Sequence, residues 1–152
     1  AWASACRPRP LGAAGRSTCV ELFARDGNGP GYCVFNFAPS GDWAAYAFDE
    51  YRPAPRDAPQ PPIEVTVQTT GLGQLRLRAR IDLPAAFASD PAALGAASWR
   101  LNCAAVIEAA DGALSYWAAH HPRAQPDFHD AQGFRIALQG APALAGSKVA
   151  PR

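Results

Sequence analysis

The sequence predicts an all-β protein, an antiparallel β-sandwich built from short strands with very little helix. Several segments alternate apolar with polar residues, which is the two-residue period of a strand with one buried face. Clusters of Gly, Pro, Asn and Asp separate these segments at regular intervals, as they separate the strands of a sandwich. A length of 152 residues is enough for one domain with its own core.

The first three strands are predicted within the aromatic-rich segment that runs from residue 17 to residue 52. The first covers Thr18–Ala24, and the turn Asp26–Gly31 after it consists of residues that tolerate positive φ. The second covers Tyr32–Phe37 and the third Trp43–Tyr51, with a Pro- and Gly-containing turn between them. These short strands in sequence predict one antiparallel sheet.

The third of these strands mixes flat aromatic side chains with hydrogen-bonding groups. Because side chains alternate between the two faces of a strand, Trp43, Asp49 and Tyr51 would share one face. Tyr46 and Phe48 would lie on the opposite face, where we expect core packing. A sheet surface that combines aromatic rings with polar groups suits a polar, disc-shaped ligand.

The second half of the chain predicts two hairpins. Five prolines between residues 52 and 62 indicate an extended connection between sheets. The strands of the first hairpin begin at Ile63 and Leu75, and Arg76, Arg78 and Arg80 form a stripe that we expect to be a solvated outer face.

The second hairpin pairs Ser98–Ala109 with Ala113–Ala119 around Asp111 and Gly112, a strong turn signal. A single helical turn is predicted at Asp90–Leu94, and the last strand at Phe134–Leu138. The domain is therefore expected to span residues 18–139, between an irregular N-terminal arm (1–17) and a flexible C-terminal tail (140–152).

Composition narrows the classes of partner. The net charge is +1 and no apolar run is long enough to cross a membrane, so neither nucleic acid nor a membrane is the expected partner. The chain contains no Met, so we expect that its true start was removed or lay elsewhere, and localisation stays open. Cys19, Cys33 and Cys103 lie beside apolar residues and are expected to be buried free thiols, with a disulfide to Cys6 as the alternative.

Three blocks of sequence resemble a known family. They are TCVELF, then YCVFNFAPSGDWAAYAFDEYR, then AVIEAADGALSYWAAHHPRAQPDFHDAQGFRIAL. Together they resemble bacterial DOMON-like domains, which are similar in turn to family 9 carbohydrate-binding modules. The resemblance covers roughly Thr18 to Leu138 and includes the order of the blocks. It implies an immunoglobulin-like β-sandwich that binds a sugar or haem without obvious catalysis.

The residues chosen as candidate ligand contacts are aromatic side chains for stacking on a sugar ring and polar side chains for its hydroxyls. They are Trp43, Asn36, Asp49, Tyr51, Arg52, Glu21, Trp117 and His121. We expect stacking over Trp43 or Trp117, and one histidine of the loop after Ala119 lining the pocket. The expected function is non-catalytic carbohydrate binding. A glycoside-active enzyme using Glu21 and Asp49 is a weaker alternative.

Two further alternatives come from other classes of protein. Haem binding would need axial ligands, but the chain has no Met, and His120, His121 and His129 all lie in one short segment. The same three histidines lack the regular spacing of metal ligands, so no metal site is expected, and a role for Ca²⁺ stays open. A protein-interaction domain is the other alternative. The resembling family has further strands ahead of Thr18, and without them an open sheet edge would allow a homodimer.

Overall fold

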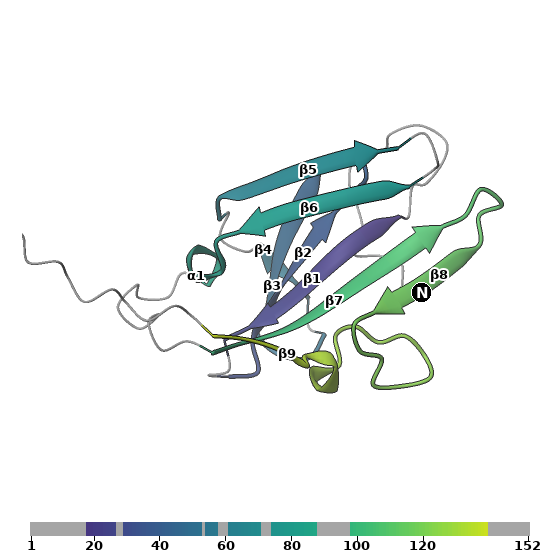
Figure 1. Cartoon of the computed structure of the whole chain (residues 1–152). Coiled ribbons are helices and arrows are strands. Elements are labelled where there is room, and N and C mark those ends of the chain that lie inside the picture. Colours follow the sequence, from purple (N-terminus) through teal and green to yellow (C-terminus); the bar gives the residue numbers. More distant parts are fainter. Residues whose placement is uncertain are drawn as a thin grey trace, which may run out of the picture.

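The computed structural model describes residues 18–26, 29–52, 54–57, 61–70, 74–87 and 98–139. The predictions for the N-terminal arm, for the turn at Asp90–Leu94 and for the C-terminal tail lie outside these residues. Within them the chain forms two antiparallel sheets that face one another, so the predicted β-sandwich is confirmed (Figure 1). No helix in the described part of the chain is long and apolar enough to cross a membrane.

The larger sheet has the strand order β4-β3-β2-β1-β7-β8, with β9 also paired to β7. Its strands are β1 (Cys19–Arg25), β2 (Tyr32–Phe37), β3 (Trp43–Phe48), β4 (Arg56–Asp57), β7 (Ser98–Glu108), β8 (Leu114–Ala118) and β9 (Ile136–Gln139). The first three strands are sequential neighbours because short turns connect them, whereas β7 returns from the second half of the chain to pair with β1.

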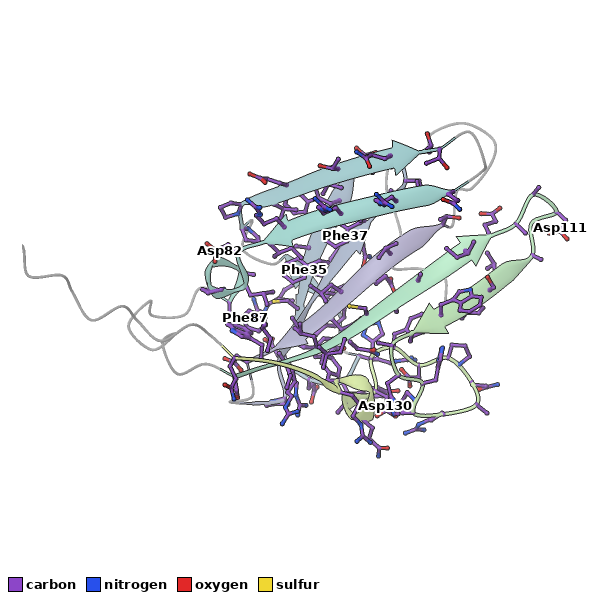
Figure 2. The ribbon with its side chains drawn as sticks, in the orientation of Figure 1. Phe35, Phe37, Asp82, Phe87, Asp111 and Asp130 are labelled. Atoms are coloured by element: carbon purple, nitrogen blue, oxygen red, sulfur yellow. The ribbon has the colours of Figure 1, made fainter. Side chains whose placement is uncertain are left out.

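The second sheet is the hairpin of β5 (Ile63–Thr69) and β6 (Leu75–Ile81), which lies across one face of the larger sheet (Figure 1). We call this face the hairpin face. Its buried side chains are Ala24, Cys33, Phe35, Phe37, Ala45, Ala47 and Trp99. Ile63, Val65 and Leu77 of the hairpin pack against them, and Figure 2 shows Phe35 and Phe37 between the two layers. The alternation of these strands therefore places an apolar core between the sheets.

The opposite face of the larger sheet, which we call the loop face, is covered by the segment between β8 and β9 (residues 119–135). Its buried members are Phe23, Tyr32, Val34, Phe48 and Ala104 from the sheet, together with Phe128 and Phe134 from the covering segment. As a result β2 is buried at every position, because the covering segment closes the face that the hairpin does not.

Strands β8 and β9 occupy the same side of β7, one after the other. Residues 104–108 of β7 pair with β8, and residues 98–101 pair with β9. The main-chain N–H of Ala119 donates to the carbonyl of Cys103 at 2.8 Å, so the chain leaves the ladder only after this point. In effect, one edge strand is interrupted by the segment 119–135, which folds over the loop face (Figure 1).

Several predicted boundaries are wrong. β3 ends at Phe48 and not at Tyr51, because the chain bends at Asp49–Arg52 and Arg52 adopts a left-handed φ of 55°. The proline-rich connection contains the short strand β4, paired to β3. The short helix α1 spans Leu83–Ala86, where no helix was predicted. The last strand begins at Ile136, two residues later than expected.

The cysteine prediction is partly wrong. Cys33 is a buried free thiol as expected, whereas the free thiol of Cys103 is exposed. Cys19 is fully buried but is disulfide-bonded. Its partner lies outside the described residues.

Candidate functional site

A cavity of about 420 Å³ opens at one end of the sandwich, where β2 begins and β3 ends. Its walls come from the turn before β2, from both strands, from β4 and from the end of α1. The lining residues are Asp26, Gly29, Gly31, Tyr32, Cys33, Ala47, Phe48, Arg56, Ala86 and Phe87. Phe87 and the charged residues Asp26 and Arg56 therefore border the hollow, whereas the rings of Tyr32 and Phe48 pack in the core of the loop face.

The strand register pairs two aromatic residues next to the cavity. Tyr32 is the first residue of β2 and lies opposite Phe48, the last residue of β3. Their rings stack with centroids 4.8 Å apart and an interplanar angle of 5°. Phe87, which follows α1, packs on Trp99 of the core with centroids 4.8 Å apart (Figure 2). Packing of this kind fixes the rings in place before any ligand enters.

Gly31 allows the turn before β2 to approach the end of β3. A Cβ atom at this position would lie 3.3 Å from the carbonyl oxygen of Phe48. That distance is tighter than an ordinary van der Waals contact, so a larger residue would push the turn away from the strand. The close approach forms one wall of the cavity.

The guanidinium of Arg56, which lines the cavity, is solvated. Arg56 forms an ion pair with Asp49 at 3.0 Å, and both side chains are largely exposed. Water weakens such a pair, so the guanidinium can exchange Asp49 for a ligand group at little cost. Deeper in the cavity, burial raises the pKa of Cys33 to about 11, and this thiol stays neutral at pH 7.

A hydrogen-bonded network holds Tyr32 on the loop face. The hydroxyl of Tyr32 is 2.8 Å from Nδ1 of His129, and the main-chain N–H of Arg52 donates to the Tyr32 oxygen at 3.5 Å. Burial lowers the pKa of His129 to about 4, so its ring is neutral at pH 7. Since the Tyr32 oxygen accepts from Arg52, we assign its proton to the bond with His129.

Asp127 joins the covering loop to the bend after β3. Its carboxylate accepts a hydrogen bond from the Tyr51 hydroxyl and another from Nη2 of Arg52, each 2.6 Å long. Burial alone would raise the pKa of Asp127, but these two partners hold it below its usual value. The charged bonds explain why Arg52 keeps its left-handed backbone conformation.

The covering loop is also held by its own contacts. Asp130 accepts hydrogen bonds from Nε of Arg123 at 2.8 Å and from the main-chain N–H of Gln132 at 2.9 Å. A Cβ atom on Gly133 would lie 2.9 Å from Nδ2 of Asn102, so a larger residue would displace this buried amide of β7. These contacts fix the loop that carries Asp127 and His129.

A second polar pair lies further along the loop face. Glu21 of β1 and Asn36 of β2 are direct cross-strand partners, and both are about 5% exposed (6% and 5%). Burial raises the pKa of Glu21 to about 7. A carboxyl group in this position is therefore close to half-protonated at neutral pH, which is uncommon outside functional sites.

The structure distributes the candidate residues over several places. Tyr51 and Arg52 meet in the network with Asp127, and Asp49 lies beside the cavity through its pair with Arg56. Glu21 and Asn36 form the pair just described.

The other three candidates lie apart from these groups. Trp43 packs against the core at the opposite end of β3 from the cavity. Trp117 is 64% exposed on β8, and the ring of His121 contacts Phe128 with centroids 5.8 Å apart. The expected common face of Trp43, Asp49 and Tyr51 does not exist, because β3 ends before the last two.

Sequence reasoning missed six residues of this region, namely Tyr32, Phe48, Arg56, Phe87, Asp127 and His129. A signal for one of them was present, since Tyr32 follows directly on the turn Asp26–Gly31. Within the described residues no group of three or more His, Cys, Asp or Glu side chains could hold a metal ion.

Comparison of the chain with models of known protein families, with curated proteins and with solved structures finds no match. The function is therefore inferred from the geometry of the site.

Proposed function

We propose that this protein is a non-catalytic ligand-binding domain that takes a small polar ligand, a carbohydrate, in the cavity at the ends of β2 and β3. The observation that carries the proposal is the cavity itself. Its volume of about 420 Å³ falls in the range of small-molecule sites, which is roughly 300–1,000 Å³. The aromatic ring of Phe87 and the guanidinium of Arg56 are the combination of stacking surface and hydrogen-bonding group that a pyranose ring with hydroxyl groups requires.

The chemistry of the lining groups supports binding over catalysis. Burial raises the pKa values of both Tyr32 and Cys33, so neither is activated as a nucleophile or base. The carboxylate of Asp127 is bound by Tyr51 and Arg52 and stays ionised. These groups hold the bend and the covering loop in place, and Arg56, whose ion pair with Asp49 is exposed, lies at the cavity to bond ligand hydroxyls.

The proposal places the ligand at a different position from the one that Trp43 and Trp117 would give. The proposal includes the resemblance to DOMON-like domains and their immunoglobulin-like sandwich. This resemblance rests on the order of the three sequence blocks. Tyr51, Arg52 and Asp49 then act at the back and the rim of the cavity.

Calorimetry tests the proposal with three variants, after a thermal-shift screen of mono- and oligosaccharides with and without Ca²⁺ has selected a sugar. Phe87→Ala removes one wall and should weaken binding roughly tenfold or more, as loss of an aromatic anchor does. Trp117→Ala and Trp43→Ala are the controls and should keep the affinity. Loss of binding in either control, with Phe87→Ala unaffected, would return the site to the tryptophans. A flat sugar screen would reject the carbohydrate.

A second candidate function is association through an open sheet edge. β8 ends the strand order of the larger sheet, and it exposes Leu114, Tyr116 and Trp117 without a charged residue in the strand. Uncharged edge strands pair readily with other chains, so a homodimer through β8 is the form we propose. Sedimentation should show a concentration-dependent dimer that Tyr116→Lys abolishes. A monomer at all concentrations would reject this candidate.

A further inference from the structure

The outer surface of the β5–β6 hairpin carries a regular row of arginines that the cavity does not use. Arg76, Arg78 and Arg80 are exposed and alternate with the apolar side chains that face the core. Side chains two apart on a strand repeat at about 6.6 Å, which is twice the rise per residue. The hairpin therefore presents three guanidinium groups in a row on its outer face.

The register shows what lies opposite each arginine. Arg80 lies opposite Glu64, at 3.7 Å between charged atoms, but both side chains are about four-fifths exposed (84% and 78%) and the pair is weak. Arg78 lies opposite Thr66 and Arg76 opposite Gln68. Each of these two arginines is thus paired with a neutral hydrogen-bonding side chain, and neither has an ion pair within the described residues.

Such a row has an electrostatic cost. Like charges in line on one strand repel, and with one acidic residue opposite them the outer face carries an excess of two positive charges. The chain as a whole has a net charge of only +1, so this excess is local to the hairpin. An anionic partner with charges spaced along its length would relieve the repulsion.

We propose that the outer face of the hairpin, formed by Arg76, Arg78, Arg80, Thr66 and Gln68, binds a linear anionic polysaccharide. Each guanidinium can take a carboxylate or sulfate in a bidentate contact, while Thr66 and Gln68 bond the neighbouring hydroxyls. A chain of sugar acids carries anionic groups and hydroxyls side by side along its length, as the hairpin carries arginines beside Thr66 and Gln68. This surface is separate from the cavity, and the proposal does not depend on ligand binding there.

The same face is poorly suited to nucleic acid. Proteins that hold single strands combine basic groups with aromatic rings on which bases stack, and none of the six outward side chains of the hairpin is aromatic. Strongly basic overall charge, the usual mark of duplex binding, is also missing. The row of arginines with neutral hydrogen-bonding neighbours favours a polysaccharide.

The test measures binding of sodium polygalacturonate at several NaCl concentrations. The double variant R76Q/R78Q removes the two arginines that lack an acidic neighbour, and R100Q/R135Q removes the same charge from exposed positions elsewhere. We expect the first variant to lose at least tenfold in affinity and to lower the salt slope by about two, one for each charge contact. The control should bind like the wild type.

Equal losses in both variants would overturn the proposal, because they would show a response to net charge alone. No binding of the wild type at low salt would also overturn it. Single-stranded DNA and neutral dextran are measured beside the polygalacturonate. Tighter binding of the DNA would replace the polysaccharide with nucleic acid, and equal binding of dextran would show that the arginines do not select an anion. Phe87→Ala should leave polygalacturonate binding unchanged, which separates this surface from the cavity.

Discussion

The two faces of the larger sheet are both buried, yet they are buried in different ways. The hairpin face packs against another sheet, and its core members are apolar, with the neutral Cys33 thiol as the one titratable group among them. The loop face is covered by an irregular segment and holds Glu21, Asp127 and His129. A regular sheet can cover its neighbour with apolar side chains alone. An irregular segment brings main-chain and polar groups into the interior, and these need partners.

The comparison implies that packing on the hairpin face contributes most to stability. Phe35→Ala removes a fully buried ring between the two sheets and should lower the free energy of unfolding by about 3–5 kcal/mol. Phe128→Ala removes a ring from the covering loop and should cost less than about 3 kcal/mol, since a loop can relax into the space. Urea unfolding measures both. Equal costs would show that the loop is as rigid a cover as the hairpin.

The loop face should also make stability depend on pH through Glu21. Its folded pKa of about 7 lies above the ordinary value of 4.5, so the unfolded chain ionises first. The free energy of unfolding therefore falls by about 3 kcal/mol as pH rises from 4.5 to 7, and it stays constant at higher pH. Glu21→Gln should remove this loss and unfold at higher urea than the wild type at pH 8. A variant that is less stable than the wild type at pH 8 would contradict the raised pKa.

His129 should act in the opposite direction. Its folded pKa of about 4 lies below the ordinary 6.5, so stability rises as pH rises from 4 to 6.5, by up to about 3 kcal/mol. The wild type should therefore change little between pH 4.5 and 6.5, because Glu21 and His129 compensate. His129→Phe keeps a ring against Phe23 and Phe48 and should reveal the downward slope of Glu21. A flat profile in this variant would show that the two groups do not oppose one another.

The smallest effects are expected at the bend after β3. Tyr51→Phe deletes the hydrogen bond to Asp127 from a half-exposed side chain and should cost about 1 kcal/mol. Asp49→Asn breaks the exposed ion pair with Arg56 and should cost less than about 0.5 kcal/mol. Thermal unfolding of the two variants side by side measures the difference. A larger effect for Asp49 would mean that the cavity rim supports the fold.

Sequence patterning was sufficient for the strands whose neighbours are local. The bounds of β2 and the pairing of the two hairpins are confirmed, because alternation and turn residues specify them directly. Sequence patterning did not predict the end of β3, because alternation continues through Asp49 and Tyr51 although the backbone turns there. Arg52 takes its left-handed conformation from contacts with Asp127, a residue far along the chain, and no local pattern reports such a contact.

The candidate site was harder to predict for the same reason. Tyr51, Arg52, Glu21 and Asn36 were chosen for their chemistry, and each has a polar partner or neighbour in the structure. The cavity, however, is assembled from separate segments, including α1 and β4, which were not predicted. Trp43 was chosen because a tryptophan beside a turn suggests a platform. The hairpin packs over that face, and the sequence of β3 alone does not show it.

The interrupted edge strand has a consequence for how this protein can change. β8 and β9 hold their places on β7 by separate ladders, so the two ends of the covering loop are anchored whatever lies between them. Insertions or deletions there would leave the strand register untouched, since the closure cost of a loop grows slowly with its length. The exposed residues 124–126 of this segment are the place where divergent copies can differ most while sharing one scaffold, because Phe128 and Phe134 belong to the core.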